Sequence, residues 1–295
     1  MNLLKPFVKF ALFAPLALTG ATAFSAPAKA PLQLQVYNAP AQSFHVNAVL
    51  VTGATEAAVI DSGFSRADAM RIAANVLDSG KNLTTIFISN ADPDFYFGAE
   101  LLQQQFPQAK LVTTAAVRAK IEAKMAGKLA FWAPKMGANA PSKVLLPALL
   151  GNNQFTIDGE VVEVRGTAGV LAHRPYTYIP SIHAVVGNIA VFGQLHVWTA
   201  DTQSAAERAA WLTQLDELQA LKPTRVVPGH MLPGTVEDAS TISYTRDYLL
   251  RFEQEAGKAE NSAALIKAMQ QAYPNAGLGI ALDIGAKVKK GEMQW

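Results

Sequence analysis

The stretch IFISNADPDFYFG, residues 86–98, joins an apolar, β-branched run to a loop that carries polar side chains at alternate positions. The apolar run is typical of a buried strand. Asn90, Asp92 and Asp94 follow it, and side chains spaced in this way can converge on one point, as metal ligands must. Loops at strand ends commonly hold the functional sites of α/β proteins. The same residues also fit an ordinary polar turn, begun by Asp92 and Pro93, in which Asp94 caps the next helix.

Strand-like and helix-like segments alternate on both sides of this stretch. Ser204 and Glu207 have the spacing of a capping box, and Asp158-Gly159 is typical of a hairpin turn. Two sheet-like halves with interspersed helices predict a layered α/β sandwich. The expected strands are 32–37, 46–51, 57–60, 83–89, 110–113, 155–157, 161–164, 176–179, 184–192 (broken by the turn Gly187-Asn188) and 225–227. The expected helices are 65–80, 99–106, 115–126, one from Ser204, and a helical region beyond 237 with a further start at Ser262.

The composition limits the chemistry that is open to the chain. Its 295 residues are 50% hydrophobic and 16% charged, which excludes a disordered or collagen-like chain. Because there is no Cys, a disulfide framework, a thiolate zinc site and a cysteine nucleophile are all excluded. Any transition-metal site must therefore draw on the five His and the carboxylates.

The first 28 residues have the pattern of a secretory signal peptide. Lys5 and Lys9 precede an apolar stretch from Phe10 to about Ala23, and small residues follow. The stretch is shorter than the roughly 20 apolar residues that a membrane helix requires. Cleavage after Ala23 or Ala28 would satisfy the pattern of small residues at such sites.

Removing this segment changes the charge balance. Residues 1–28 contain two Lys and no acidic residue, so the remaining chain carries 23 basic and 23 acidic side chains. No run of Lys and Arg remains, which argues against nucleic acid or an anionic membrane as a partner. We therefore expect a periplasmic or secreted protein without a stable membrane span, whose partner is a small-molecule substrate or ligand. The sequence does not indicate an oligomeric state.

Several motifs together resemble the metallo-β-lactamase superfamily, in order from about residue 33 to 235. They are the strand and loop at 86–98, the strand end VIDSG at 59–63, Phe192-Gly193-Gln194, and Pro228-Gly229-His230. The resemblance implies a four-layer αβ/βα sandwich with extra C-terminal helices. It also implies a metallo-β-lactamase-like domain over residues 29–236, followed by a helical extension over 237–295 that packs on the same domain.

The signature loop of the superfamily reads His-x-His-x-Asp-His, and this chain departs from it. Asn90 and Asp92 stand for the first two histidines, Asp94 keeps the aspartate, and Phe95 stands for the last histidine. Phe95 cannot coordinate a metal. In addition, Gln194 replaces the carboxylate that bridges two metals, so the dinuclear centre of the superfamily is not expected.

The resemblance leaves a donor set for at most one divalent ion. Asp92, Asp94, His173 and His230 would provide two carboxylates and two imidazoles, a set that suits zinc first, with iron or manganese as alternatives. In the superfamily these positions belong to two different subsites, so a single ion would have to lie between them.

Two functions follow from this pattern. The first is an exported hydrolase in which one metal ion activates water against an ester, lactone, β-lactam or similar bond. Asp94 would orient the nucleophile, with Asn90 and Gln194 as weaker ligands or hydrogen-bond partners. The second is a metal-free pseudoenzyme or binding protein, in which Phe95 and its aromatic neighbours make the old site an apolar pocket.

Three features outside the loop allow two interpretations each. His196 is either a substrate contact or replacement ligand, or a histidine that packs on Trp198 and bonds to Asp201, which we favour. Arg174 could bind an anionic group, although a lone Arg is usually a surface residue. The C-terminal helices either shape the cleft or, as we prefer, cover a sheet edge, and Trp295 is expected to pack back onto the body.

Overall fold

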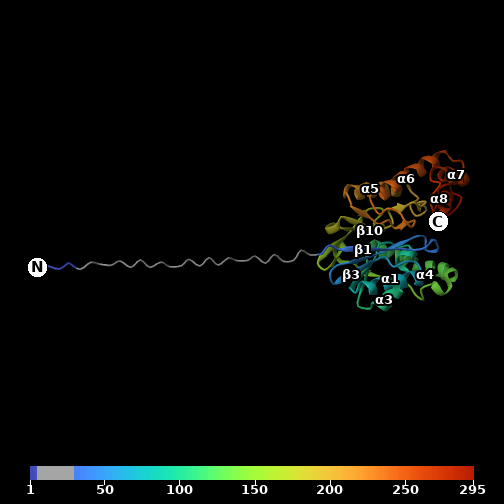
Figure 1. Cartoon of the computed structure of the whole chain (residues 1–295). Coiled ribbons are helices and arrows are strands. Elements are labelled where there is room, and N and C mark those ends of the chain that lie inside the picture. Colours follow the sequence, from blue (N-terminus) through green and yellow to red (C-terminus); the bar gives the residue numbers. More distant parts are fainter. Residues whose placement is uncertain (5–29) are drawn as a thin grey trace.

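The computed structural model describes residues 1–4 and 30–295, so the expected signal segment lies almost entirely outside the described residues. Two β-sheets face each other, and helices cover the outer face of each (Figure 1). Helices α1, α3 and α4 lie on one side, and α5 and α6 lie on the other. This is the four-layer sandwich expected from the sequence, and the prediction of the fold class is confirmed.

The first sheet has six strands in chain order, with β1 to β3 antiparallel and β3 to β6 parallel. Parallel neighbours need a crossover connection, and helices provide it here. The strands are β1 (Gln33–Asn38), β2 (Asn47–Thr52), β3 (Glu56–Ile60), β4 (Asn82–Ile88), β5 (Lys110–Thr113) and β6 (Ala148–Leu149); the helices are α1 (Arg66–Ser79), α2 (Pro93–Tyr96), α3 (Ala99–Gln105) and α4 (Ala115–Met136), with short 3₁₀ turns η1 (Ala41–Ser43), η2 (Gly137–Asn139) and η3 (Gly151–Asn153).

The second sheet has the strand order β12-β10-β9-β8-β7, and β11 pairs with β13 in a separate two-stranded sheet. The later helices pack on the outer face of the five-stranded sheet, and the core between them includes Trp211 and Tyr248, both fully buried. The elements are β7 (Gln154–Ile157), β8 (Glu160–Arg165), β9 (Tyr176–Ile179), η4 (Pro180–Ile182), β10 (Ala184–Asn188), β11 (Phe192–Gly193), α5 (Ala205–Ala220), β12 (Arg225–Val226), β13 (His230–Met231), α6 (Ser240–Lys258), α7 (Ser262–Ala272) and α8 (Gly279–Lys289).

A layer of aliphatic and aromatic side chains joins the two sheets. Val51, Ile60 and Phe87 from the first sheet and Ile179 and Val186 from the second belong to this one buried cluster. Strands β3 and β10, which contribute to it, are buried on both faces along almost their whole length, which explains why they are continuous apolar runs in the sequence, whereas the edge strand β7 exposes Gln154 and Thr156.

Helix starts and the break in the segment 184–192 agree with the sequence, whereas the end of α4 does not. Ser65 and Ser204 both begin helices with reciprocal capping bonds, as expected. Helix α4 runs ten residues past the expected end at 126, because good helix formers continue after Gly127 and outweigh the roughly 1 kcal/mol that an internal Gly costs. The expected break of the segment 184–192 at the turn Gly187-Asn188 is confirmed, since the chain leaves the sheet after Asn188 and resumes as β11 in the small sheet.

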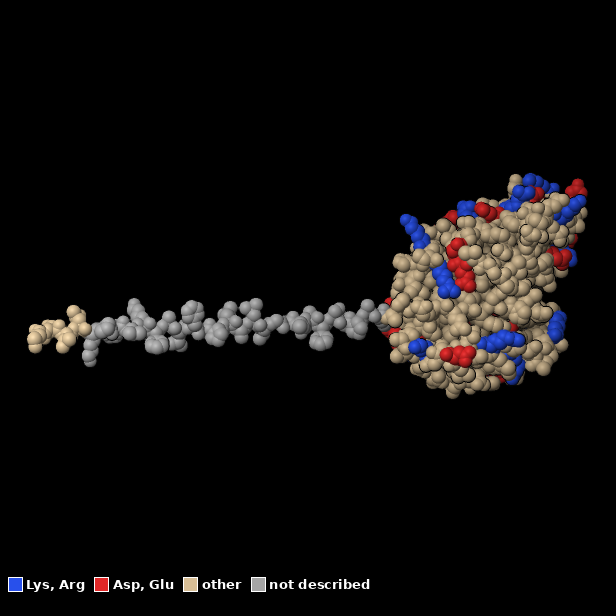
Figure 2. All heavy atoms as spheres, viewed as in Figure 1, with Lys and Arg blue, Asp and Glu red and all other residues tan. Residues whose placement is uncertain are grey.

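The described surface carries charges of both signs. On the face shown in Figure 2, Lys and Arg side chains are intermixed with Asp and Glu. Among the described helices, none combines the length and apolar character that crossing a membrane requires.

Candidate functional site

The loop that follows β4 is fixed to the end of β3 by buried hydrogen bonds. Asp61, with φ of +64°, accepts bonds of 2.7 Å from both the backbone N–H and the hydroxyl of Ser89. Burial raises the pKa of the Asp61 carboxyl to about 7. The backbone N–H and the hydroxyl of Ser62 both donate to the Phe95 carbonyl. At Gly98 a Cβ would lie 1.9 Å from the Ser62 carbonyl oxygen, so this contact requires glycine.

Asn90 shapes the turn within this loop. Its Oδ1 accepts a 2.8 Å bond from the backbone N–H of Asp92, as in an Asx turn, and the residue is buried. Asp92 occupies the N-cap position of α2, and Pro93 is the first helical residue. The polar-turn interpretation is therefore right for Asn90 and Pro93, but the residue at the cap is Asp92 and not Asp94.

Asp94 and His230 face each other across the junction of the two halves. The Oδ2 of Asp94 lies 3.4 Å from the Nε2 of His230, whose Nδ1 lies 2.9 Å from the Phe44 carbonyl oxygen. Since that carbonyl can only accept, Nδ1 carries the hydrogen and Nε2 faces Asp94. Burial lowers the pKa of His230 to about 4, and burial together with the charge of Asp92 raises the pKa of Asp94 well above its usual value. Both shifts favour the neutral forms, in which a protonated Asp94 carboxyl can donate to the unprotonated Nε2 of His230.

Two phenylalanine rings enclose His230. Phe192 stacks on its imidazole with ring centroids 5.2 Å apart, and Phe95 meets it edge-on at 5.5 Å. Both phenylalanines are fully buried. This apolar environment is the physical cause of the low pKa of His230.

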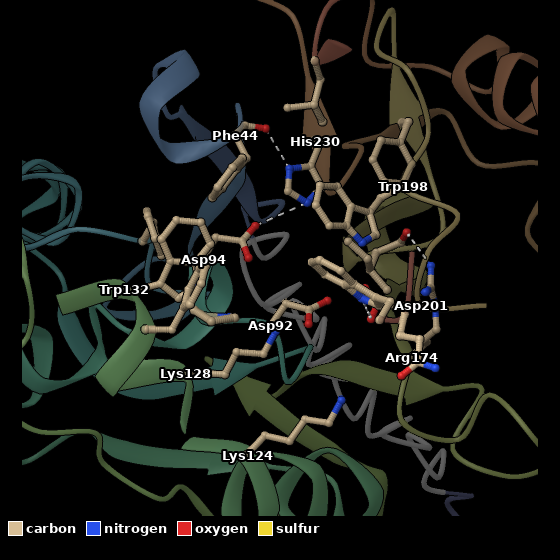
Figure 3. Close-up of a pocket in the computed structure, with 18 residues that line it drawn as sticks. Phe44, Asp92, Asp94, Lys124, Lys128, Trp132, Arg174, Trp198, Asp201 and His230 are labelled. Atoms are coloured by element: carbon tan, nitrogen blue, oxygen red, sulfur yellow. Dashed lines mark hydrogen bonds and ion pairs between the residues drawn. The ribbon is translucent and has the colours of Figure 1, made fainter. Parts of the chain in front are cut away.

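A cavity of about 410 Å³ opens beside this pair, in the size range of small-molecule sites (Figure 3). Its walls come from α4, from the loops around β9 and β11, and from the C-terminal residues. Seven of its lining residues are aromatic, and six carry ionisable groups of both signs besides His230. The aromatic residues are Phe44, Phe64, Phe131, Trp132, Phe192, Trp198 and Trp295, and the charged ones are Asp92, Asp94, Asp201, Lys124, Lys128 and Arg174.

The acidic groups of the cavity are not equivalent. Asp201 accepts a 2.8 Å bond from the Nε1 of Trp295, whereas the Asp92 carboxylate makes no hydrogen bond or ion pair with any described residue. Burial and the charge of Asp201 raise the pKa of Asp92 to about 6, and the positive charges of Lys128 and Arg174 oppose this rise. Asp92 is thus a partly exposed acid that faces the cavity.

Arg174 is a buried residue of the cavity wall, which corrects the interpretation that it is a surface residue. Its side chain is 3% exposed, one guanidinium nitrogen lies 3.3 Å from the Ile189 carbonyl oxygen, and the group stacks 4.3 Å from the ring centre of Trp211. The planar guanidinium suits such stacking on an aromatic face.

His173 does not line the cavity, although its neighbour Arg174 does. Burial and the positive charges of Lys120 and Arg174 lower the pKa of His173 to about 4. Gln194 is exposed, has a φ of +56° and accepts a backbone bond from Gly277 through its carbonyl oxygen. The structure therefore does not bring His173 and Gln194 together with Asp92, Asp94 and His230.

His196 is a packed side chain with a partner different from the expected one. Its Nδ1 lies 2.9 Å from the hydroxyl of Tyr248, not near Asp201, and the two rings meet edge-on. The expected bond to Asp201 is wrong, because Asp201 instead accepts from the C-terminal Trp295. The prediction that Trp295 packs back onto the body is confirmed, since its ring meets Trp198 at 5.5 Å.

The C-terminal segment contributes to the cavity, in contrast to the preferred interpretation that it only covers a sheet edge. Leu278, Gln294 and Trp295 line it. Lys124, Lys128 and Trp132 were not indicated by the sequence; Lys128 and Trp132 lie in the part of α4 beyond the expected end at 126, whereas Lys124 lies within the expected helix but in no motif. The good helix formers after Gly127 were the signal that could have indicated Lys128 and Trp132.

The donor residues do not fit the metal centre of the superfamily. Within residues 30–295, no three His, Asp or Glu side chains lie together as a group that could share a metal ion. Asp94 and His230 are paired with each other, and Phe95 closes the position of the fourth loop ligand. Arg174 and Lys128 also bring positive charge to the same cavity.

Comparison with known proteins identifies the family of this chain. The family model described as the metallo-beta-lactamase superfamily matches residues 42–230, and the chain belongs to this superfamily. A search of the curated proteins finds no match.

Solved structures give the same architecture at low sequence identity. A metallo-beta-lactamase family protein from Thermus thermophilus has a TM-score of 0.60 and 16% identity, over 89% of this chain and 92% of that chain. A metallo-beta-lactamase from Pontibacter korlensis has a TM-score of 0.51 and 19% identity, over 75% and 95% of the two chains. At such identities these likenesses show the fold alone. Membership of the superfamily suggests a hydrolase-type function.

Proposed function

We propose that this chain is a small-molecule-binding protein that kept the metallo-β-lactamase fold and uses its old active-site pocket without a metal ion. One observation carries the proposal: Asp94 and His230, two donors of the family site, contact each other at 3.4 Å between the buried rings of Phe95 and Phe192. A cavity that combines aromatic and other apolar walls with polar groups is typical of ligand sites.

Binding of a neutral fluorescent probe tests this proposal. N-phenyl-1-naphthylamine becomes fluorescent in apolar surroundings, and we expect it to bind one site per chain, with the same affinity in the presence of a chelator. Trp132→Ala should weaken this binding about tenfold, because it removes one aromatic wall. Leu77→Ala, which removes an exposed side chain on α1, is the matched control. Absence of saturable binding, or its loss on chelation, would contradict a metal-free pocket.

The second candidate function is hydrolysis of an ester, lactone or β-lactam bond with at most one metal ion. The acid–base pair of Asp94 and His230 beside an open cavity, together with membership of the superfamily, supports it. Lactone, β-lactam and phosphodiester substrates, assayed with and without added zinc, iron or manganese, test this function. Turnover that Asp94→Asn abolishes would establish it and overturn the binding-protein proposal.

We further propose that the protein is exported to the periplasm or secreted after removal of its first residues. Lys5, Lys9 and the apolar stretch that follows support this proposal. N-terminal sequencing of the protein from fractionated cells should find a start after Ala23 or Ala28. A full-length chain confined to the cytoplasm would contradict export.

A further inference from the structure

Arg174 is a buried cation with unused hydrogen-bond donors at the cavity wall. A guanidinium has five N–H groups, and the one side-chain bond within the described residues goes to the Ile189 carbonyl. Its Nε is buried and has no partner among them. An unpaired polar group in such a place costs free energy until something supplies an acceptor.

No carboxylate of the described chain satisfies this cation directly. Arg174 makes no ion pair within 4 Å there, although Asp201 and Asp92 act on it from further away. Asp201 is bonded to Trp295, and Asp94 contacts His230. A buried charge normally requires a paired and hydrogen-bonded counter-charge, and here the space for one is the cavity itself.

Asp92 does not fill this role, because it is balanced from the other wall. Lys128 on α4 stabilises the charge of Asp92 more than Arg174 does. Figure 3 shows Lys128 and Lys124 reaching toward the cavity on the side of Asp92, and Arg174 on the side of Asp201. Among the cations that line the cavity, Arg174 is therefore the buried one whose donors are open to a ligand, whereas Lys124 and Lys128 are more exposed to solvent.

The rest of the cavity offers aromatic surfaces on two sides. Phe64 lies 5.4 Å from Phe44 and 5.2 Å from Trp132, measured between ring centres, and forms one wall. Trp198 and Trp295 form the other. Rings in such positions pack well against a flat apolar body.

Building on the proposed function, we infer that the ligand is an amphipathic organic acid, in which one oxyanion binds Arg174 and an aromatic or otherwise apolar body lies between Trp132 and Trp198. A guanidinium binds a carboxylate or sulfonate through two parallel hydrogen bonds, which adds affinity and fixes orientation.

A matched pair of probes separates this inference from the proposed function. The probe 8-anilinonaphthalene-1-sulfonate has the same ring system as N-phenyl-1-naphthylamine and adds one sulfonate. We expect the sulfonate probe to bind the wild-type chain at least tenfold more tightly than the neutral one, by fluorescence titration. Arg174→Gln should bring the ratio of the two affinities to about one, whereas Arg246→Gln, at an exposed arginine on α6, should retain the preference.

The other outcomes are also decisive. Equal affinities of the two probes in the wild type, or an unchanged preference in Arg174→Gln, would overturn the anion site while leaving the binding pocket intact. Failure of both probes to bind would overturn the proposed function itself. If Arg174→Gln does not fold, Arg174→Lys decides: it keeps the charge but loses the planar donors, so an unchanged preference for the sulfonate probe would again overturn the inference.

Discussion

The cavity has a floor and a rim that differ in how their side chains are held. The floor is formed by Asp94 and His230, which line the cavity, together with Phe95 and Gly98, which lie behind this lining in the same loop region as Asp94. These residues stand at positions of the family motifs and are buried and closely packed. The rim, formed by Lys128, Phe131 and Trp295, comes from α4 and the C-terminus and is partly or largely exposed. The floor keeps the positions of the family motifs without a grouped set of metal donors among the described residues, whereas the chemistry available to a ligand comes mainly from groups outside the family loop.

Replacement of the buried ring of the floor should have the largest effect. Phe95→Ala removes a fully buried side chain and should lower the free energy of unfolding by about 3–5 kcal/mol. The matched change on the rim, Phe131→Ala, removes a ring that is 55% exposed. It should change the free energy of unfolding by no more than about 0.5 kcal/mol. Urea denaturation measures both, and similar losses for the two variants would contradict the distinction between floor and rim.

The pH dependence of stability should reveal the buried acid beneath the floor. The pKa of Asp61 is about 7 in the folded chain and 3.8 as its ordinary value, so the folded state binds the proton more tightly. Its contribution is therefore fully present below about pH 4 and is lost as the pH rises to about 7, by on the order of 4 kcal/mol.

Asp61→Asn tests this, because the amide cannot ionise. Relative to wild type, the variant should gain stability as the pH rises from 4 to 7. Asp238→Asn is the control, since hydrogen bonds from Ser240 lower the pKa of Asp238. The contribution of Asp238 to stability is therefore present at higher pH and lost as the pH falls, opposite to that of Asp61. A wild-type-to-variant difference at Asp61 that does not change with pH would show that the carboxyl titrates normally.

Two glycines offer the next contrast. Gly98→Ala places a Cβ against the backbone of Ser62 and should destabilise the fold by about 3 kcal/mol. Gly127→Ala, within α4 on the rim side, meets no atom within 4 Å and should stabilise by about 0.5–1 kcal/mol. Thermal unfolding of the pair checks both signs, and a neutral Gly98→Ala would show that the loop does not require this close approach.

The smallest change in stability is expected at the C-terminus. Trp295→Ala removes a hydrogen bond to Asp201 and a ring contact with Trp198, for about 1 kcal/mol. It should also speed dissociation of a bound probe, since the ring lines the cavity. Met293→Ala, at a nearby exposed residue, should change neither quantity. Unaltered dissociation in Trp295→Ala would remove the C-terminus from the site.

The sequence was sufficient to predict the fold, because the information for it is local. Alternating apolar runs, the capping residues Ser65 and Ser204 and the hairpin at Asp158-Gly159 each specify an element without reference to the others. The turn Gly187-Asn188 also indicated the break after Asn188, whereas the pairing of β11 with the distant β13 was not predicted. Such pairing is decided by tertiary contacts.

The site was predictable only in its floor. The motif positions indicated Asp92, Asp94, Phe95 and His230, and the structure places them beside one cavity. His173 does not line this cavity, because the neighbouring Arg174 points into the wall in its place. The rim could not be predicted from local patterns. It combines the second half of α4 with the C-terminal residues, and only the tertiary packing brings these two segments together.

The central claim is that this site works without a metal ion, and equilibrium dialysis against zinc tests it most directly. The untagged protein, prepared without added metal and then dialysed with zinc, should retain well below one ion per chain when analysed by elemental mass spectrometry. Because Asp94 and His230 contact each other and Phe95 closes the neighbouring position, His230→Ala should not change this value. About one ion per chain in the wild type, lost in His230→Ala and Asp92→Ala, would contradict the claim.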